Sequence, residues 1–119
     1  MESDLAIRRL SALAQDGRLK VFRLLVTAGG AGMAAGDIAR ELDTAANTMS
    51  AQLLILSNAG LVKARRDGRS IIYAVNFDAM RDLLVFMTED CCARSPEICA
   101  PLAEMATAAR CEPKTRKGA

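Results

Sequence analysis

The chain has 119 residues, carries a formal net charge of +2, and is 51% hydrophobic but only 3% aromatic. This length provides one core, and a core of mainly aliphatic side chains favours helices over a β-sandwich. The sequence contains no histidine, which excludes Ser-His-Asp and Cys-His catalysis and every zinc site that needs a histidine ligand. It also lacks a glycine-rich phosphate-binding loop. We therefore expect a mainly helical protein that is not an enzyme and binds no organic cofactor.

The hydrophobic residues do not form a membrane-spanning segment. A helix that crosses a bilayer needs about 20 consecutive apolar residues, and Arg23, Asp37 and Arg40 interrupt the apolar stretches. The N-terminal sequence MESDLAIRRL mixes both charges and lacks the apolar centre of a secretory signal. These observations predict a cytoplasmic protein with no membrane partner.

Two helices are expected near the N-terminus. Ser3 or Asp4 can cap the first, and so short a helix usually needs a partner to cover its apolar stripe. Asp16 can cap the second, which the glycines at 29 and 30 end. Apolar residues recur at helical spacing in this second helix, so we predict that it belongs to the core.

A helix-turn-helix is predicted over residues 35–58. Residues 35–42 form a short supporting helix, and Asp43-Thr44 supplies a turn and the N-cap of the next helix. That helix, residues 45–58, has one apolar stripe toward the core and is followed by Gly60. The stripe consists of Met49, Leu53 and Leu56, with Leu54 and Ile55 flanking it.

The opposite face of residues 45–58 is predicted to be the recognition surface. Its side chains are short and uncharged, and they include donors and acceptors that can read base edges in a DNA groove. Polar faces are also common on helices that only face solvent, so this helix alone does not decide between the two interpretations. The candidates for base contacts are Asn47, Thr48, Ser50 and Gln52, with Ala51 on the same face.

A basic hairpin follows directly. Residues 61–65 and 70–75 are predicted strands, and Asp-Gly within the connection Arg66-Asp67-Gly68-Arg69 is a strong hairpin signal. Residues 61–70 contain four basic side chains against one acid, whereas residues 76–104 contain six acids against two arginines. Cations on such a hairpin suit phosphate contacts or insertion into the minor groove. These cations are Lys63, Arg65, Arg66 and Arg69.

Helix-turn-helix and hairpin together predict a DNA-binding protein. The expected fold is mainly α with a two-stranded β-wing, a winged helix-turn-helix whose DNA-binding core is residues 35–75. We expect residues 1–119 to form one domain.

Three segments resemble the ArsR-type winged-helix repressors. They are ALAQDGRLKVFRLL, NTMSAQLLIL and SNAGLVKARRDGRSIIY, and the resemblance covers about residues 8–86. It implies a homodimer that dimerises through its N- and C-terminal helices, binds double-stranded operator DNA and releases it when a metal or metalloid binds. It also places Thr48, Ser50 and Gln52 on the family's DNA-contacting positions, residues 65–69 on its wing, and residues 78–90 on its C-terminal dimerisation helix.

The familiar sensing sites of that family are absent from this chain. Many members carry a cysteine pair in the supporting helix, which here reads GDIAREL, and others need histidine. All four cysteines lie after residue 90, at Cys91, Cys92, Cys99 and Cys111. Pro96 and Pro101 interrupt a regular helix around Cys99, so this residue is expected on a loop that can fold back toward the vicinal pair.

Three thiolates, from Cys91, Cys92 and Cys99, match the three-coordinate preference of trivalent arsenic or antimony, and Cys111 would complete a tetrahedral zinc or cadmium site. A reducing compartment disfavours a disulfide, and buried structural thiols remain the ordinary alternative. We therefore expect a repressor induced by arsenite or antimonite. Sensing of methylated trivalent arsenicals through two sulfurs, of cadmium or zinc, or of thiol redox state remains open. Residues 78–111 are then the dimerisation and sensor segment, and residues 112–119 a flexible tail.

Overall fold

The computed structural model describes residues 1–88 of the chain. The chain divides into two units, residues 1–83 and residues 84–119, and of the second only residues 84–88 are described. The predicted cysteine cluster and the predicted tail therefore lie outside the described residues. The first unit contains the whole of the predicted DNA-binding core, residues 35–75.

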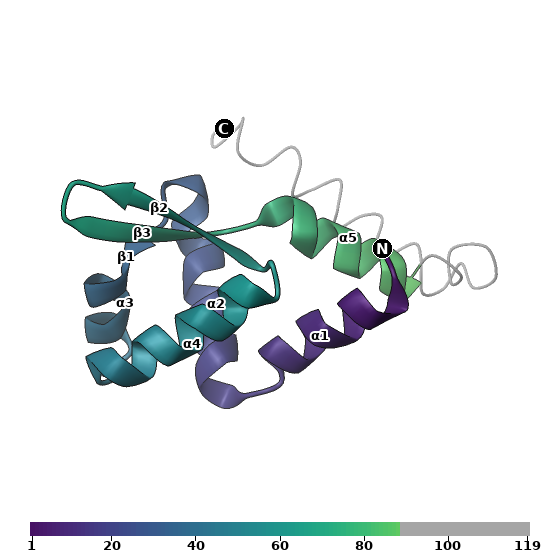
Figure 1. Ribbon diagram of the computed structural model, residues 1–119, viewed down its shortest axis with the longest axis horizontal. Helices are drawn as coiled ribbons and strands as arrows, with labels where there is room; N and C mark the ends of the chain where they lie inside the picture. Colours follow the sequence, from purple (N-terminus) through teal and green to yellow (C-terminus); the bar gives the residue numbers. More distant parts are fainter. Residues whose placement is uncertain (89–119) are drawn as a thin grey trace. The chain divides into compact units, whose positions relative to one another are not determined.

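Helices form most of the described chain, and two longer strands form a hairpin between the fourth and the fifth α-helix (Figure 1). The elements in chain order are α1 (Ser3–Leu13), α2 (Asp16–Ala28), the 3-10 helix η1 (Gly29–Ala31), β1 (Met33–Ala34), α3 (Ala35–Glu41), α4 (Ala46–Asn58), β2 (Val62–Asp67), β3 (Ser70–Val75) and α5 (Phe77–Thr88). The predicted supporting helix, recognition helix and wing strands are all present. The fold is the expected winged helix-turn-helix.

The sheet contains one strand more than predicted. β3 lies in the middle, antiparallel to both β2 and β1. Strand β1 has only two residues, Met33 opposite Tyr73 and Ala34 opposite Ile72, and so short a strand leaves no alternating pattern in the sequence. Gly32, at φ 72°, permits this pairing, because a Cβ there would collide with the carbonyl oxygen of Tyr73.

One apolar core joins the helix-turn-helix to the sheet. Met49, Leu53 and Leu56 of α4 are buried, as predicted, against residues of α2, α3 and the strands, and no charged or polar residue is buried within residues 1–88. Full burial of one such side chain stabilises the fold by about 1.5–3 kcal/mol. The fully enclosed side chains of the largest volume are Leu25, Ile38, Met49, Leu53, Leu56, Leu61 and Val21.

The predicted helix caps were wrong. Asp16 is the first residue of α2, and the residue before it supplies the cap, since Gln15 Oε1 accepts the Arg18 N–H at 2.9 Å. Helix α1 starts after Glu2 and helix α4 after Ala45, both without a side-chain cap. The hydroxyl of Thr44 instead donates to the Leu42 carbonyl at 3.0 Å, so the preceding turn uses the group that was expected to cap α4.

Two arginines and one asparagine donate hydrogen bonds to carbonyls at or just beyond helix ends. Arg9 Nε donates to the Ala59 carbonyl at 2.9 Å, and Arg18 Nε donates to the Ala12 carbonyl at 2.6 Å. These arginines satisfy carbonyls at the C-terminal ends of α4 and α1, where helices lack internal partners. Asn76 likewise donates to the Gly60 carbonyl at 3.1 Å. The end of α4 is thereby connected to α1, and the residues that follow α4 are connected to the residue before α5.

Helix α5 begins one residue earlier than predicted, at Phe77, and is described as far as Thr88. Its side chains Ala79 and Leu83 are buried. None of the helices within residues 1–88 is long and apolar enough to cross a membrane.

Candidate nucleic-acid interface

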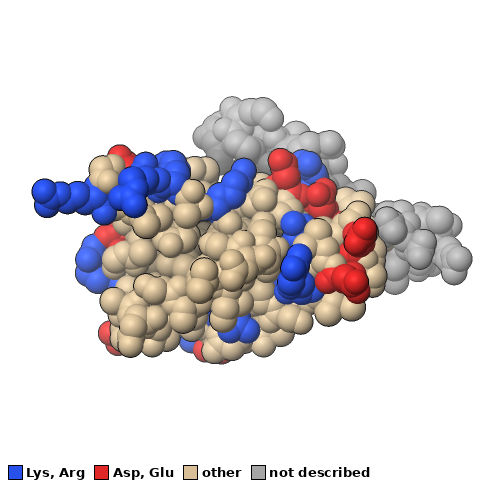
Figure 2. All heavy atoms as spheres, in the orientation of Figure 1, with Lys and Arg blue, Asp and Glu red and all other residues tan. Residues whose placement is uncertain are grey.

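The surface of α4 carries no charge. Its sequence, ANTMSAQLLILSN, contains no Lys, Arg, Asp or Glu. Figure 2 shows an extended uncharged surface over this helix and one group of basic side chains at the wing, with other basic side chains elsewhere on this face. A helix of this kind cannot form the bidentate contacts that Arg or Lys makes with guanine. It can offer only neutral hydrogen bonds and apolar contacts to a groove.

The predicted recognition residues divide into two groups. Asn47, Thr48 and Ser50 are exposed, and Asn47 Oδ1 accepts the Thr48 N–H at 2.9 Å in the first turn. Gln52 is half-buried, and its amide lies so close to Gly17 of α2 that a Cβ at residue 17 would collide with it. The structure therefore brings three of the four candidates to the exposed face and packs Gln52 against α2.

A stripe of four exposed residues runs along α4 on the side away from its buried residues. It consists of Asn47, Ala51, Leu54 and Asn58, spaced four, three and four apart, the spacing that aligns side chains on one face of a helix. The sequence pattern predicted Leu54 beside the core stripe, but its side chain is 60% exposed. The exposure of Leu54 could have been predicted from the rotation of 100° per residue along an α-helix.

The wing is a hairpin with a two-residue loop. Asp67 pairs with Ser70 across the strands, so the loop is Gly68-Arg69 rather than the four residues expected. Gly68 has φ 64° and Arg69 does not have a positive φ, which matches the type II′ turn with glycine first. Arg69 therefore lies at the tip of the wing.

The four wing cations do not share one face. Successive residues of a strand point to opposite sides of a sheet, so Lys63 and Arg65 lie on one face of β2 and Arg66 on the other. All of β2 beyond Val62 is exposed. The three ion pairs found within residues 1–88 join Lys20 to Asp16, Arg40 to Asp37 and Arg81 to Asp78. No ion pair in that part of the chain neutralises a wing cation.

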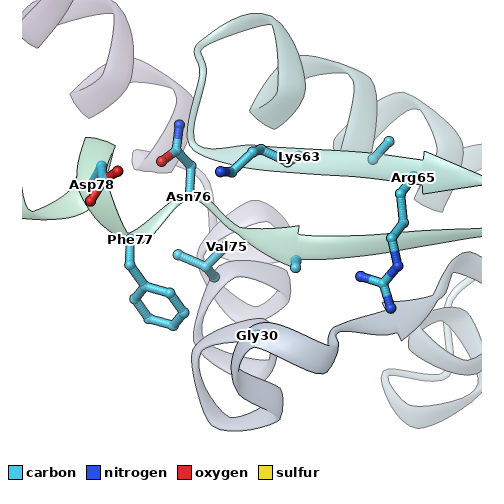
Figure 3. A pocket seen from close by; sticks show the side chains of 9 residues that line it. Gly30, Lys63, Arg65, Val75, Asn76, Phe77 and Asp78 are labelled. Atoms are coloured by element: carbon cyan, nitrogen blue, oxygen red, sulfur yellow. The ribbon is translucent and has the colours of Figure 1, made fainter.

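Lys63 and Arg65 border a hollow of about 470 Å³ on one face of the sheet (Figure 3). Ala74 contributes to its lining, together with Phe77 and Gly30. Arg65 Nη2 donates to the carbonyl of Ala31 at 3.0 Å. Arg65 therefore ties β2 to η1, while its remaining guanidinium N–H groups stay available because the residue is exposed.

Within residues 1–88 no three His, Cys, Asp or Glu side chains are close enough together to hold a metal ion. The predicted ligands Cys91, Cys92, Cys99 and Cys111 lie beyond the part of the chain that is described. The geometry of the predicted sensor therefore remains a prediction from sequence.

Comparisons with known proteins agree with this geometry. A family model described as a helix-turn-helix domain matches residues 13–65. The solution structure of Mb0332 (fragment 1–100) from Mycobacterium bovis, described as a homodimeric winged helix-turn-helix DNA-binding domain and a possible ArsR-family transcriptional regulator, is 34% identical over 73% of this chain and 80% of that one, with a TM-score of 0.60. A crystal structure of the same fragment gives 36% identity, coverage of 73% and 92%, and a TM-score of 0.59.

Two further solved structures have the same fold. NolR from Sinorhizobium fredii is 29% identical over 73% of this chain and 84% of that one, with a TM-score of 0.58. HlyU from Vibrio cholerae is 25% identical over 73% and 97%, also with a TM-score of 0.58. None of the curated proteins compared with this chain matches it.

Proposed function

The chain belongs to the ArsR family of winged helix-turn-helix, DNA-binding transcriptional regulators, and we propose that it is a homodimeric repressor that leaves its operator when trivalent arsenic or antimony binds cysteine thiolates. The observation that carries the DNA-binding part is an exposed, uncharged recognition face on α4 followed by a wing whose four cations lack ion pairs within residues 1–88. The observation that carries the sensor part is the placement of all four cysteines after residue 90.

In the proposed complex, α4 lies in the major groove and the wing contacts the flanking backbone. Asn47, Thr48 and Ser50 contact base edges, and Lys63, Arg66 and Arg69 neutralise phosphates. Gln52 contributes mainly by fixing α4 against α2. A dimer presents two recognition helices to half-sites about one helical turn apart, so the operator is an imperfect palindrome.

The dimer is supported by apolar side chains left uncovered on α1. Ile7 is 59% and Leu10 is 40% exposed, and an exposed apolar stripe on a short helix is typical of a protein interface. The similar M. bovis domain is described as homodimeric. We propose that α1 of this chain packs against a second copy of the chain.

The sensor is proposed to act through α5. Asn76, directly before this helix, accepts the Ala79 N–H at 3.2 Å through Oδ1 and donates through Nδ2 to Gly60, two residues beyond α4. A displacement of α5 on metalloid binding would therefore change the position of the end of the recognition helix. Cys91, Cys92 and Cys99 are the proposed ligands, and the reducing cytoplasm would keep them as thiols.

Cys111 supports a second candidate function. A fourth thiolate favours a tetrahedral ion such as zinc or cadmium over a three-coordinate metalloid. The number of thiols that a bound metalloid or metal ion protects from a thiol reagent separates the alternatives. Three per chain indicate inorganic arsenite, two a methylated arsenical, and four a tetrahedral metal ion. Protection of none, with disulfide formation under oxidant, indicates a redox sensor.

The test is release of DNA by arsenite. A duplex is first selected from a randomised library, and its affinity is then measured by fluorescence anisotropy at one salt concentration, with and without arsenite. We expect release from the wild-type protein and retained binding without release in Cys91→Ser, Cys92→Ser and Cys99→Ser. Cys111→Ser is the matched control and should still release. Unchanged affinity of the wild-type protein under saturating arsenite would contradict the sensor assignment.

A further inference from the structure

We infer that Leu54, with Ala51, determines operator specificity by contacting the methyl groups of thymine bases in the major groove. This inference rests on the proposed placement of α4 in that groove. It adds an apolar contact that the polar candidates on the helix do not supply. It also names the base for which the protein selects.

The first step is the exposure of Leu54. Its side chain is 60% exposed, the largest exposed fraction among the large hydrophobic residues of the described chain, whereas the adjacent Leu53 is fully buried. Leu53 already fills the core position of this turn. Leu54 therefore makes no comparable contribution to packing, and its apolar surface faces water until something covers it.

The second step is its position. Asn47, Ala51, Leu54 and Asn58 follow one another along the outward side of α4, and on a helix this spacing forms one continuous row. The same row begins with a proposed base-contacting residue, Asn47. A ligand that covers Asn47 on that face also contacts Ala51 and then Leu54. We therefore take the DNA groove that α4 enters as the ligand that covers Leu54.

The third step is chemical complementarity. No residue of α4 is charged, so the helix has no arginine or lysine for the O6 and N7 atoms of guanine. One acceptor of the polar set, Asn47 Oδ1, already receives the Thr48 N–H. Among base edges in the major groove, only thymine presents a methyl group, and apolar side chains contact it. Ala51 and Leu54 therefore match T·A pairs.

The experiment removes that methyl group alone. Duplexes are selected with the wild-type protein from a randomised library, and each thymine of the enriched site is then replaced singly by deoxyuridine. We expect one or two positions in each half-site at which uracil weakens binding roughly fourfold, the factor that burial of one methyl-sized group provides. In Leu54→Ala, uracil and thymine should bind within about twofold of each other at the position that Leu54 contacts, whereas a position that Ala51 contacts should keep its preference. A double-mutant cycle isolates this loss of coupling.

Two controls keep the outcomes distinct. Arg66→Ala should weaken binding to both duplexes and keep the difference between thymine and uracil. Thermal denaturation verifies that Leu54→Ala is folded, which its exposure leads us to expect. Enriched sites that bind equally well with uracil, or a thymine preference that persists at every sensitive position in Leu54→Ala, would overturn the inference alone. Failure to enrich any sequence would overturn the proposed function and the inference with it.

Discussion

Gly32 is the residue on which the pairing of strand β1 with β3 depends. Its φ of 72° is strained for any residue with a Cβ, and that Cβ would collide with the Tyr73 carbonyl. We predict that Gly32→Ala lowers the free energy of unfolding by about 2 kcal/mol or more, because strain of this kind alone costs about 1–3 kcal/mol. Urea denaturation measures the change.

Two neighbouring glycines supply matched controls for Gly32. Gly29 has the same φ but no atom within 4 Å of an added Cβ, so Gly29→Ala should show the strain alone, about 1 kcal/mol. Gly30 has neither a positive φ nor a close neighbour, so Gly30→Ala should change stability by less than about 0.5 kcal/mol. Equal effects at all three positions would contradict the proposed collision.

Leu53 and Leu54 are adjacent in sequence but differ in environment. Leu53 is fully buried and Leu54 is mostly exposed. Leu53→Ala should lower the free energy of unfolding by about 2–5 kcal/mol, the cost of a cavity in a packed core, whereas Leu54→Ala should lower it by less than about 0.5 kcal/mol. Denaturation of the two variants under the same conditions makes the comparison. A large loss in Leu54→Ala would mean that α4 is rotated from the orientation described.

At the scale of elements, we predict that the wing determines the salt dependence of DNA binding. Arg66 and Arg69 are exposed and have no ion pair within residues 1–88. Substitution of either residue by alanine should weaken binding and reduce the magnitude of the slope of log affinity against log salt by about 2, because the proposed dimer loses one phosphate contact in each subunit. Arg81→Ala, which removes a cation paired with Asp78, should leave the slope unchanged. An unchanged salt slope in both variants would exclude Arg66 and Arg69 from the DNA interface.

The helices and strands also show how much of the fold could be predicted from the sequence. Apolar spacing and glycines predicted α2, α3 and α4 and the two wing strands, because helix and strand periods differ and helices end at glycine. Strand β1 was missed, since two residues carry no period. The caps of α2 and α4 were misplaced, because side-chain oxygens near a helix start, such as those of Gln15 and Thr44, compete for several backbone partners.

For the candidate site, the sequence predicted which residues α4 and the wing contain but not how they are arranged. The packing of Gln52 on Gly17 and the bond from Arg65 to Ala31 join residues distant in sequence. No local pattern encodes such contacts. The exposure of Leu54 was accessible from the helical repeat alone, but its hydrophobic character favoured assignment to the edge of the core.

At the scale of the whole molecule, we propose that the dimer is held together by α1. Ile7 and Leu10 are exposed in the single chain, and a carboxylate buried at an apolar interface would lack a partner. We predict that Leu10→Glu produces a monomer that binds DNA weakly, as measured by analytical ultracentrifugation and anisotropy. Ile71→Glu, at a comparably exposed position on β3, should remain dimeric. A dimeric Leu10→Glu would place the interface elsewhere.

The central claim is that metalloid binding and DNA binding are coupled in one protein, and coupling of this kind is reciprocal. The direct measurement is the affinity of the dimer for arsenite, free and when saturated with its selected duplex, at one salt concentration. We predict that DNA weakens arsenite binding, taken over both sites of the dimer, by the same overall factor by which saturating arsenite weakens DNA binding, about 5- to 150-fold for typical allosteric coupling. Equal arsenite affinity of the free and DNA-bound protein would contradict the claim.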